Sequence, residues 1–330
     1  MNGKTVTTTD NCYAYRAHTE AMLNFGEDAA RSHLELSGWL VDTKELDDLE
    51  KSDGHLKRVE WTKNSRAIEV IGNVHVDMCN QPLLILNNVD ARFSFIMNNP
   101  DFYINGPTGD TSIVKIIDAT LYIKYCHIAP QVLLAHNKML AQTPAFYPYK
   151  RCAINTFVVA SGSSTLSLDN IVNGQLPTSI IIMMVDTDAF AGSRDKNPFN
   201  FKTNGITELQ LYVSGIQFPN ETLAMNFSDE SVYARAYSTL FSVNGILHST
   251  QGNLITKEMY KNGSFMVGYD LSQEANGGNS SCVSINNQGS LRLTARFSKQ
   301  LASSITVMAY MLYDSVIHID SHRNVTVDYN

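Results

Sequence analysis

Short runs of β-branched and aromatic residues, bounded by Asn, Gly, Pro or Asp, recur along most of the chain. In SLRLTARF, residues 290–297, the apolar Leu291, Leu293 and Ala295 alternate with polar side chains. This period of two is typical of an antiparallel strand with one buried face. Because such runs do not alternate regularly with helical segments, a parallel βαβ sheet is disfavoured. The sequence predicts a mainly β protein built as sandwiches.

Three segments are predicted to be helical instead, at residues 13–35, 130–143 and 231–242. The first has an apolar stripe of Ala, Met and Leu, which is the pattern of a helix packed on a core. Gly26 stands where a helix C-cap is expected, so residues 27–35 would form a second short helix. A helical hairpin between strands explains the segment.

Residues 13–35 also contain a pair of opposite charges and two histidines. Arg16 and Glu20 are four apart, and an ion pair between them would contribute about 0.3–0.5 kcal/mol if it is exposed. His18 and His33 are interpreted as helix-surface residues rather than as metal ligands.

The helix predicted after residue 130 divides the strand runs into two clusters. LLILNNVDARFSF in the first cluster and VSINNQGSLRLTARF in the second both place Asn-Asn before an alternating run that contains Arg. This is a weak internal repeat. We therefore expect two similar β-sandwich units, at residues 1–129 and 151–330, joined by a helix-bearing linker at residues 130–150.

The charge of the chain excludes one class of partner. The formal net charge is −7, and no run of Lys or Arg is present. A protein that binds nucleic acid electrostatically needs a basic stripe, so strong direct nucleic-acid binding is not expected. Charged residues make up 17% of the sequence, below the roughly 25% that is usual. A surface that is polar mainly through amides and hydroxyls suits a protein that buries much of it against copies of itself.

The cysteines and the first residues of the chain indicate in which cellular compartment the protein is expected. The five cysteines are widely spaced and form no Cys-x-x-Cys pair, so we expect buried free thiols in a reducing compartment. They are Cys12, Cys79, Cys126, Cys152 and Cys282. The first residues lack the apolar core of a signal peptide, and no apolar stretch approaches the roughly 18–20 residues of a membrane span. We expect synthesis inside the cell, no secretion and no membrane span.

The sharpest candidate for chemistry is HIDSH. On a strand, a period of two would place His318, Asp320 and His322 on one face, as metal ligands can be. The alternative interpretation is a strand that runs out into a polar edge. His75 and Asp77 form a similar, smaller pattern. We favour the interpretation without a metal in both places.

Other polar clusters lack the spacing of a known site. Asp186, Asp188 and Asp195 are crowded enough for a calcium loop but do not follow the EF-hand order, so a long turn at a subunit contact is favoured. SGSST at residues 161–165 lacks the Gly-x-Ser-x-Gly elbow. NGGNSS at residues 276–281 lacks the spacing and the Lys of a phosphate loop. The sequence predicts no catalytic residues, no metal and no cofactor.

Several long segments together resemble one family. YAYRAHTEAMLNFGEDAARSHL near the start is similar to a segment of the double jelly-roll major capsid proteins of Polinton (Maverick) elements and adintovirus-like viruses. Further similar segments are RAIEVIGNVHVDMCNQPLLILNNVDARFSFI, VKIIDATLYIKYCHIAPQVLLAHNKML, YPYKRCAINTFVVASG, NIVNGQLPTSIIIMMVDTDAFAGSRDKNPFNF and GSLRLTARFSKQLASSITVMAYMLYDSVIHIDSHRNVTVDY. The resemblance covers nearly the whole chain.

The resemblance implies a non-enzymatic virion protein. It would have two jelly-roll sandwiches side by side, and three chains would form a pseudo-hexagonal capsomer that contacts other capsomers and a penton or minor capsid protein. There is one departure, because the family has more chain ahead of the point that corresponds to Met1. We therefore expect the first jelly roll to lack its N-terminal strands, which leaves unpaired edges.

Two alternatives remain open. A β-sandwich binding module, carbohydrate-recognising or domesticated by a host, would show an exposed aromatic platform that faces a cleft. A cupin-like metal enzyme would bring His318, Asp320 and His322 together inside a barrel with a further ligand.

Overall fold

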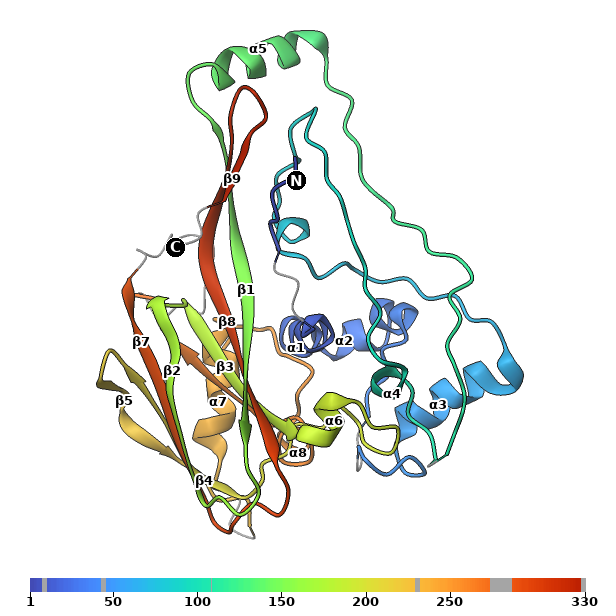
Figure 1. Ribbon diagram of the computed structural model, residues 1–330, viewed down its shortest axis with the longest axis vertical. Helices are drawn as coiled ribbons and strands as arrows, with labels where there is room; N and C mark the ends of the chain where they lie inside the picture. The colour runs from blue at the N-terminus through green and yellow to red at the C-terminus, as the bar shows by residue number, and fades with distance from the viewer. Residues whose placement is uncertain (8–10, 43–45, 108, 229–231, 274–286, 328–330) are drawn as a thin grey trace.

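The computed structural model describes all residues except 8–10, 43–45, 108, 229–231, 274–286 and 328–330. Residues 145–327, which we call the sandwich, hold two antiparallel sheets (Figure 1). Sheet A has the strand order β1-β8-β3-β6, with β9 paired to β8, and sheet B has the order β2-β7-β4-β5. The mainly β fold class with a few short helices is confirmed.

The strands have the following bounds: β1 Ala145–Val159, β2 Thr165–Gln175, β3 Ser179–Asp186, β4 Ile206–Val213, β5 Ile216–Ala224, β6 Met266–Asp270, β7 Gln288–Phe297, β8 Ile305–Ile319 and β9 Val325–Val327.

The first eight strands pair in a nested way. β1 pairs with β8, β2 with β7, β3 with β6, and β4 with β5, all antiparallel. From β1 to β8 the chain can thus be followed as one long hairpin, in which β1 to β4 run antiparallel to β5 to β8. Winding this hairpin up adds the contacts of β3 with β8 and of β4 with β7. This is the jelly-roll arrangement, which closes two sheets over a common core.

Which side chains of a strand are buried depends on what covers each face of its sheet. In β7, Leu291, Leu293 and Ala295 are buried and the intervening side chains are not, which confirms the predicted alternation. All eight residues of β3 are buried, because sheet B covers one face and helix α1, Tyr13–Asn24, lies over the other. The Thr19 hydroxyl of α1 contacts the Met183 sulfur of β3 at 3.8 Å. A strand covered on both faces needs a continuous apolar run.

The far ends of β1 and β8 extend beyond sheet B, together with β9, as an arm (Figure 1). Burial in β8 changes there from continuous to alternating, since only one face of the arm is covered. That face carries a second, small apolar cluster, in which Tyr147, Ile317 and Ile319 meet Val6 and Met78 from the start of the chain.

Residues 1–144, which we call the N-terminal region, contain helices and extended chain. The helices are α1, α2 Glu27–Ala30, η1 His33–Ser37, α3 Asp53–Thr62, η2 Lys63–Ser65, η3 Asp77–Cys79, α4 Pro100–Tyr103 and α5 Pro130–Leu140. The segment after α1 matches the predicted short helix only in part, since it divides into α2 and η1. Within the sandwich lie α6 Thr187–Ala191, α7 Ala234–Val243 and α8 Lys257–Lys261, and α5 and α7 correspond to the two other predicted helices.

The strand runs predicted before residue 130 do not form strands. The described residues ahead of Ala145 contain no assigned strand. Ile96, Ile117 and Tyr125 are examples of large apolar side chains exposed there. The physical reason is that a strand becomes stable only when a neighbour pairs with its backbone. The helices near the start are likewise not flanked by strands, and a first jelly roll at residues 1–129 stays a proposal.

The predicted repeat and the predicted thiols can also be placed. The run at 83–95 is extended chain, whereas its counterpart contains β7; residues 283–286 lie outside the described residues. Cys79, Cys126 and Cys152 are free thiols, and Cys12 is buried. Two of them, Cys79 and Cys126, are exposed rather than buried, and Cys282 lies outside the described residues.

Candidate functional site

The three side chains of HIDSH do not converge. The His318 ring lies edge-on to Phe146 of β1, with ring centroids 4.7 Å apart. Asp320 begins the turn between β8 and β9, where its carboxylate accepts hydrogen bonds from the backbone N–H of His322 at 2.9 Å and of Asn324 at 2.8 Å. Among the described residues, no group of three or more His, Cys, Asp or Glu side chains is arranged to hold a metal ion.

Lysines pair with two of the acidic residues that were predicted to share a long turn, although Asp186 ends β3 and Asp188 lies on α6. Asp186 pairs with Lys202 at 2.8 Å, and Lys196 lies 3.2 Å from Asp188. Lys202 also reaches Asp47 of the N-terminal region at 2.7 Å. The predicted subunit-contact loop therefore makes several of its polar contacts within its own chain.

Two smaller candidates carry no chemistry that can be described. Residues 161–164 form the turn before β2, where the backbone N–H of Gly162 donates to the Leu301 carbonyl at 2.8 Å, and Thr165 begins the strand. Residues 276–281 lie outside the described residues.

A buried polar cluster joins the N-terminal region to sheet A. Arg16 Nε donates to Glu20 Oε1 at 2.7 Å, and Arg16 Nη1 lies 2.6 Å from Asp77 Oδ1. His75 Nδ1 lies 2.6 Å from Glu20 Oε2. From the sandwich, the hydroxyl of Tyr310 donates to Glu20 at 3.4 Å. We call these residues, with the backbone N–H of Cys152, the junction cluster.

The predicted Arg16–Glu20 pair forms, and it is buried. The side chains are 8% and 10% exposed, so the pair is held in a medium in which charges interact more strongly than in water. His75 and Asp77, which the sequence presented as a coincidence, complete the cluster. The period of two that placed both residues on one side of the chain was the available signal, but nothing in the sequence identified their partner helix.

The two carboxyl groups of the junction cluster differ in proton affinity. Burial raises the pKa of Asp77 above its ordinary value, although Arg16 and the Cys152 N–H act against this. Burial acts on Glu20 in the same direction, but the hydrogen bond from His75 and the charge of Arg16 outweigh it and lower the pKa of Glu20. Burial also raises the pKa of the Cys152 thiol to about 12, so that this group stays neutral.

Aromatic rings fix helix α1 beside the loop that follows β3. Tyr15 is buried, and its ring stacks on Phe190 with centroids 5.4 Å apart. The His18 ring stacks on Phe199 at 4.4 Å, and burial lowers the pKa of His18 to about 3. His18 is half-buried and packs against Phe199, so its interpretation as a helix-surface residue is only partly right. His33 is exposed, as predicted.

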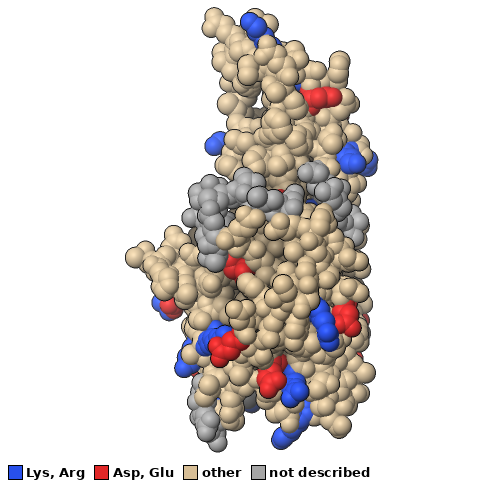
Figure 2. Space-filling model, turned by 90° about the vertical axis from the view of Figure 1, so that its left-hand side faces the viewer, with Lys and Arg blue, Asp and Glu red and all other residues tan. Residues whose placement is uncertain are grey.

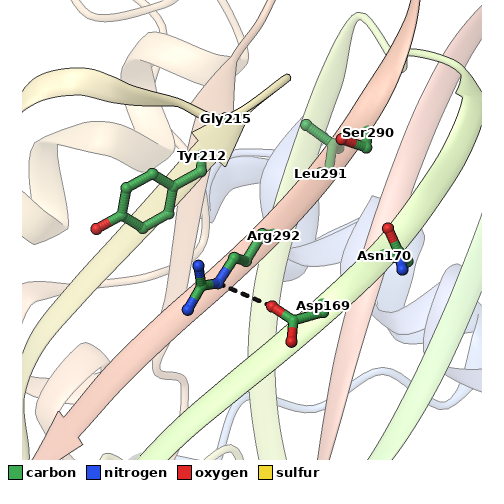
Figure 3. A pocket seen from close by; sticks show the side chains of 7 residues that line it. All are labelled: Asp169, Asn170, Tyr212, Gly215, Ser290, Leu291 and Arg292. Carbon is green, nitrogen blue, oxygen red and sulfur yellow. Dashed lines mark ion pairs between the residues drawn. The ribbon is translucent and has the colours of Figure 1, made fainter.

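A hollow of about 220 Å³ lies on the outer face of sheet B (Figure 3). Arg292 of β7 points toward Asp169 of β2, with 2.8 Å between guanidinium and carboxylate. Its guanidinium also lies 5.6 Å from the centroid of the Tyr212 ring, which belongs to the opposite residue on β4. A bulge in β2 between Leu168 and Val172 shapes the rim. The guanidinium of Arg292, which lines the hollow, is therefore already paired with the carboxylate of Asp169.

The side of the molecule on which sheet B lies carries few charges, and Lys or Arg atoms lie beside Asp or Glu atoms over its lower half (Figure 2). Besides the pair in the hollow, Arg235 lies 2.9 Å from Glu221 and Arg296 lies 3.6 Å from Glu208. This visible face therefore has no large field of one sign.

None of the described helices is long and apolar enough to cross a membrane.

Comparison with known proteins finds only distant similarity. No protein-family model matches the chain. An uncharacterized protein of Caenorhabditis elegans is 22% identical over 329 residues, which cover 96% of this chain and 75% of that protein.

Among solved structures, the chain is similar to a quasi-atomic model of the PBCV-1 virus capsid, with a TM-score of 0.37 and 9% identity over 60% of this chain and 54% of that one. The Sputnik virophage structure gives a TM-score of 0.35 and 15% identity over 56% of this chain and 39% of that one. The mavirus major capsid protein gives a TM-score of 0.28 and 10% identity over 58% of this chain and 42% of that one. The matched part is thus about half, or less, of each capsid chain.

Proposed function

We propose that this chain is a structural subunit of a viral capsid shell, with no enzymatic activity. The observation that carries the proposal is the nested pairing of eight strands over residues 145–327. This is the fold that the sequence resemblance implies for the second half of the chain. Jelly rolls also serve as lectins and enzymes, so the long similar segments, and not the fold alone, favour the capsid.

The proposal extends to the domain organisation. Residues 1–129 would be part of a first jelly roll, residues 130–150 the linker and residues 151–330 the second jelly roll. The alternating runs between residues 66 and 129 would then be strands of this jelly roll. Among the described residues of this structure, they pair with no other strand. Their exposed apolar side chains support this proposal, because soluble proteins rarely leave so much apolar surface in contact with water.

The resemblance also supplies the proposed partners. The chain would belong to the double jelly-roll major capsid proteins of Polinton (Maverick) elements and adintovirus-like viruses, as an endogenous viral element. Three copies would form a pseudo-hexagonal capsomer in the virion, in contact with other capsomers and with a penton or minor capsid protein. It would need no cofactor or metal and would not bind nucleic acid strongly.

Size-exclusion chromatography with light scattering tests self-association. We expect a species of three times the monomer mass of 36.7 kDa. Ile117→Asp should shift this species toward the monomer, because it places a charge in an exposed apolar run of the N-terminal region. Ile117 is 79% exposed.

Ile216→Asp is the matched control, since Ile216 is an isoleucine of the sandwich with a similar exposure of 73%. It should leave the trimer intact. A wild-type chain that stays monomeric at every concentration, or two variants that shift the mass equally, would count against the proposal.

The second candidate function is a saccharide-binding module, and the hollow on sheet B is the observation that favours it. Tyr212 and Arg292 offer an aromatic ring and a planar donor, as sugar sites do. A glycan array with the wild type and Tyr212→Ala tests this function. Binding that the substitution abolishes would favour the module over the shell, and no binding by the wild type would remove it.

A further inference from the structure

Two exposed runs of the N-terminal region have no partner strand among the described residues. The first is RAIEVIG at residues 66–72, and the second is SIVKIID at residues 112–118. Every residue of both runs is exposed, and neither run belongs to an assigned strand. Their large apolar side chains are Ile68, Val70, Ile71, Ile113, Val114, Ile116 and Ile117. Because β-branched residues favour strands, what both runs lack is a neighbouring strand.

The charged residues of the two runs have the same spacing and the same order of sign. Arg66 precedes Glu69 by three residues, and Lys115 precedes Asp118 by three residues. None of these four side chains has an ion-pair partner among the described residues. The carboxylate of Asp118 accepts hydrogen bonds from the two residues that follow it. All four charges are therefore available to a partner.

An antiparallel pairing of the two runs satisfies both sets of charges at once. When Arg66 lies opposite Asp118, the same register places Glu69 opposite Lys115. The other opposite pairs in this register are Ala67–Ile117, Ile68–Ile116, Val70–Val114, Ile71–Ile113 and Gly72–Ser112. A parallel pairing would instead place Arg66 opposite Lys115, and like charges directly opposite each other are destabilising. The charges thus favour one direction and one register.

The backbone of the first run is free along one edge. On the other edge, the N–H of Ile71 donates to the Leu36 carbonyl at 2.9 Å. Since successive N–H groups of an extended chain point to opposite sides, residues 66, 68, 70 and 72 present theirs to the free edge. Among the described residues, no backbone–backbone hydrogen bond involves these four residues or residues 112–118. Unpaired edges of this kind are templates for another strand.

Each run is anchored to a different part of its own chain. The hydrogen bond to Leu36 ties Ile71 to η1. Ahead of the second run, Arg194 of the sandwich holds the chain, because its Nη1 donates to the Asp110 carbonyl at 2.7 Å and its own carbonyl accepts from the Gly106 N–H at 2.9 Å. The two runs do not pair with each other in this structure. A second copy offers the same two edges without this restraint.

We propose that residues 66–72 of one copy pair antiparallel with residues 112–118 of the next copy. The pairing is a strand addition, in which main-chain hydrogen bonds supply affinity and the opposite charges set the register. It is a head-to-tail contact, and contacts of this kind form a ring when the rotation between copies closes. The inference rests on the proposed function, since a ring of three is the proposed trimer, and it identifies the contact that holds the trimer together.

Charge reversal tests the register through the trimer association constant, measured by light scattering over a series of concentrations. Glu69→Lys alone or Lys115→Glu alone places like charges opposite each other at all three contacts. Each should therefore lower the constant by at least about tenfold. The two substitutions combined in one chain restore opposite charges and should bring the constant back to within about threefold of the wild type. This rescue also shows that the single variants do not act by unfolding the chain.

An equimolar mixture of the two single variants distinguishes pairing between copies from pairing within one chain. Where a Glu69→Lys copy meets a Lys115→Glu copy through these two positions, the charges are opposite again. The mixture should therefore form trimers at lower concentration than either variant alone. Pairing within one chain would give the mixture no such advantage.

Lys124→Glu is the matched control, because it reverses an exposed charge of the same extended segment beyond the end of the register. It changes the net charge as Lys115→Glu does and should leave the association constant within about threefold of the wild type. A wild-type trimer in which both variants behave alike, a double variant without rescue, or a mixture without advantage would overturn this inference and leave the proposed function standing. A wild type that stays monomeric would overturn both.

Discussion

The sandwich and the N-terminal region each contain a run that begins with Ser-Ile and is rich in β-branched residues, but the two runs adopt different structures. SIIIMMVD forms β3, where Ile182 is 2% exposed. SIVKII at residues 112–117 is extended chain, where Ile113 is 80% exposed and Ile117 is 79% exposed. Both runs favour a strand through β-branched residues. The difference is that β3 has β6 and β8 beside it, with sheet B and α1 on its faces.

This comparison separates the capacity to form a strand from the formation of one. An isolated strand keeps its backbone hydrogen bonds to water and buries little apolar area, so little stabilises it. The partner strands of β3 are distant in sequence, since β8 follows it by more than a hundred residues. The sequence of a run therefore indicates that it can join a sheet, and the rest of the fold decides whether it does.

The largest effect is expected where the two regions meet. Arg16→Ala should lower the free energy of unfolding by about 3–5 kcal/mol, because it leaves two buried carboxyl groups without their cation. Urea unfolding measures the loss. Arg31→Ala removes an exposed cation with the same spacing from Glu27 and should cost at most about 0.5 kcal/mol. Equal losses for the two variants would show that burial of the Arg16 pair is unimportant.

The second test compares the two similar runs directly. Ile182→Ala should destabilise the chain by about 2–5 kcal/mol, because it opens a cavity in a packed core. At a concentration at which the chain is monomeric, Ile117→Ala should change the unfolding free energy by no more than about 0.5 kcal/mol. Urea denaturation of both variants provides the comparison. A large loss for Ile117→Ala would mean that the extended run is packed in solution.

The third test concerns acid. His18 has a folded pKa of about 3, so the unfolded chain binds a proton that the folded chain does not. Its contribution to stability is present above the ordinary His pKa and is lost as the pH falls toward 3. His18→Phe keeps the stack on Phe199 and removes this loss. Thermal melts should show a gain over the wild type that is larger at pH 4 than at pH 8, and a gain independent of pH would contradict the assignment.

The smallest effects are expected at helix caps. Thr256 accepts a hydrogen bond from the Met259 N–H at the start of α8, and Thr256→Ala should cost about 1 kcal/mol. Asn99 caps the four-residue α4 of the N-terminal region through the Asp101 N–H. Asn99→Ala should cost less in the unfolding of the sandwich, which urea titration followed by the β-sheet signal in circular dichroism can compare, since Trp39 and Trp61 both lie in the N-terminal region. A larger loss of stability for Asn99→Ala than for Thr256→Ala would contradict the expectation that caps in the sandwich matter more than caps in the N-terminal region.

Several features could be predicted because they depend on neighbours in sequence. The alternation in residues 290–297 predicted the buried face of β7, and the helical segments at 130–143 and 231–242 correspond to α5 and α7. The HIDSH pattern placed His318 on a strand correctly. It did not show that Asp320 would cap a turn, since that depends on where β8 ends and the chain reverses.

The candidate site was harder to predict. Arg16 and Glu20 were identified as a pair because a helix brings residues four apart together. Asp77 and His75 join them from a segment more than fifty residues away, and Tyr310 joins from β8. No local pattern specifies such a contact, so neither the burial of the cluster nor the set of residues in it could be foreseen.

By itself, the sequence determined the mainly β class, the positions of the long helices and the buried faces of strands such as β7. These properties follow from periodicity and from the conformational preferences of single residues. The tertiary structure decided which runs became strands and which stayed exposed, and it brought Arg16, Glu20 and Asp77 together. Both outcomes depend on distant segments meeting, because a hydrogen-bonded ladder and a buried charge are stable only beside their partners.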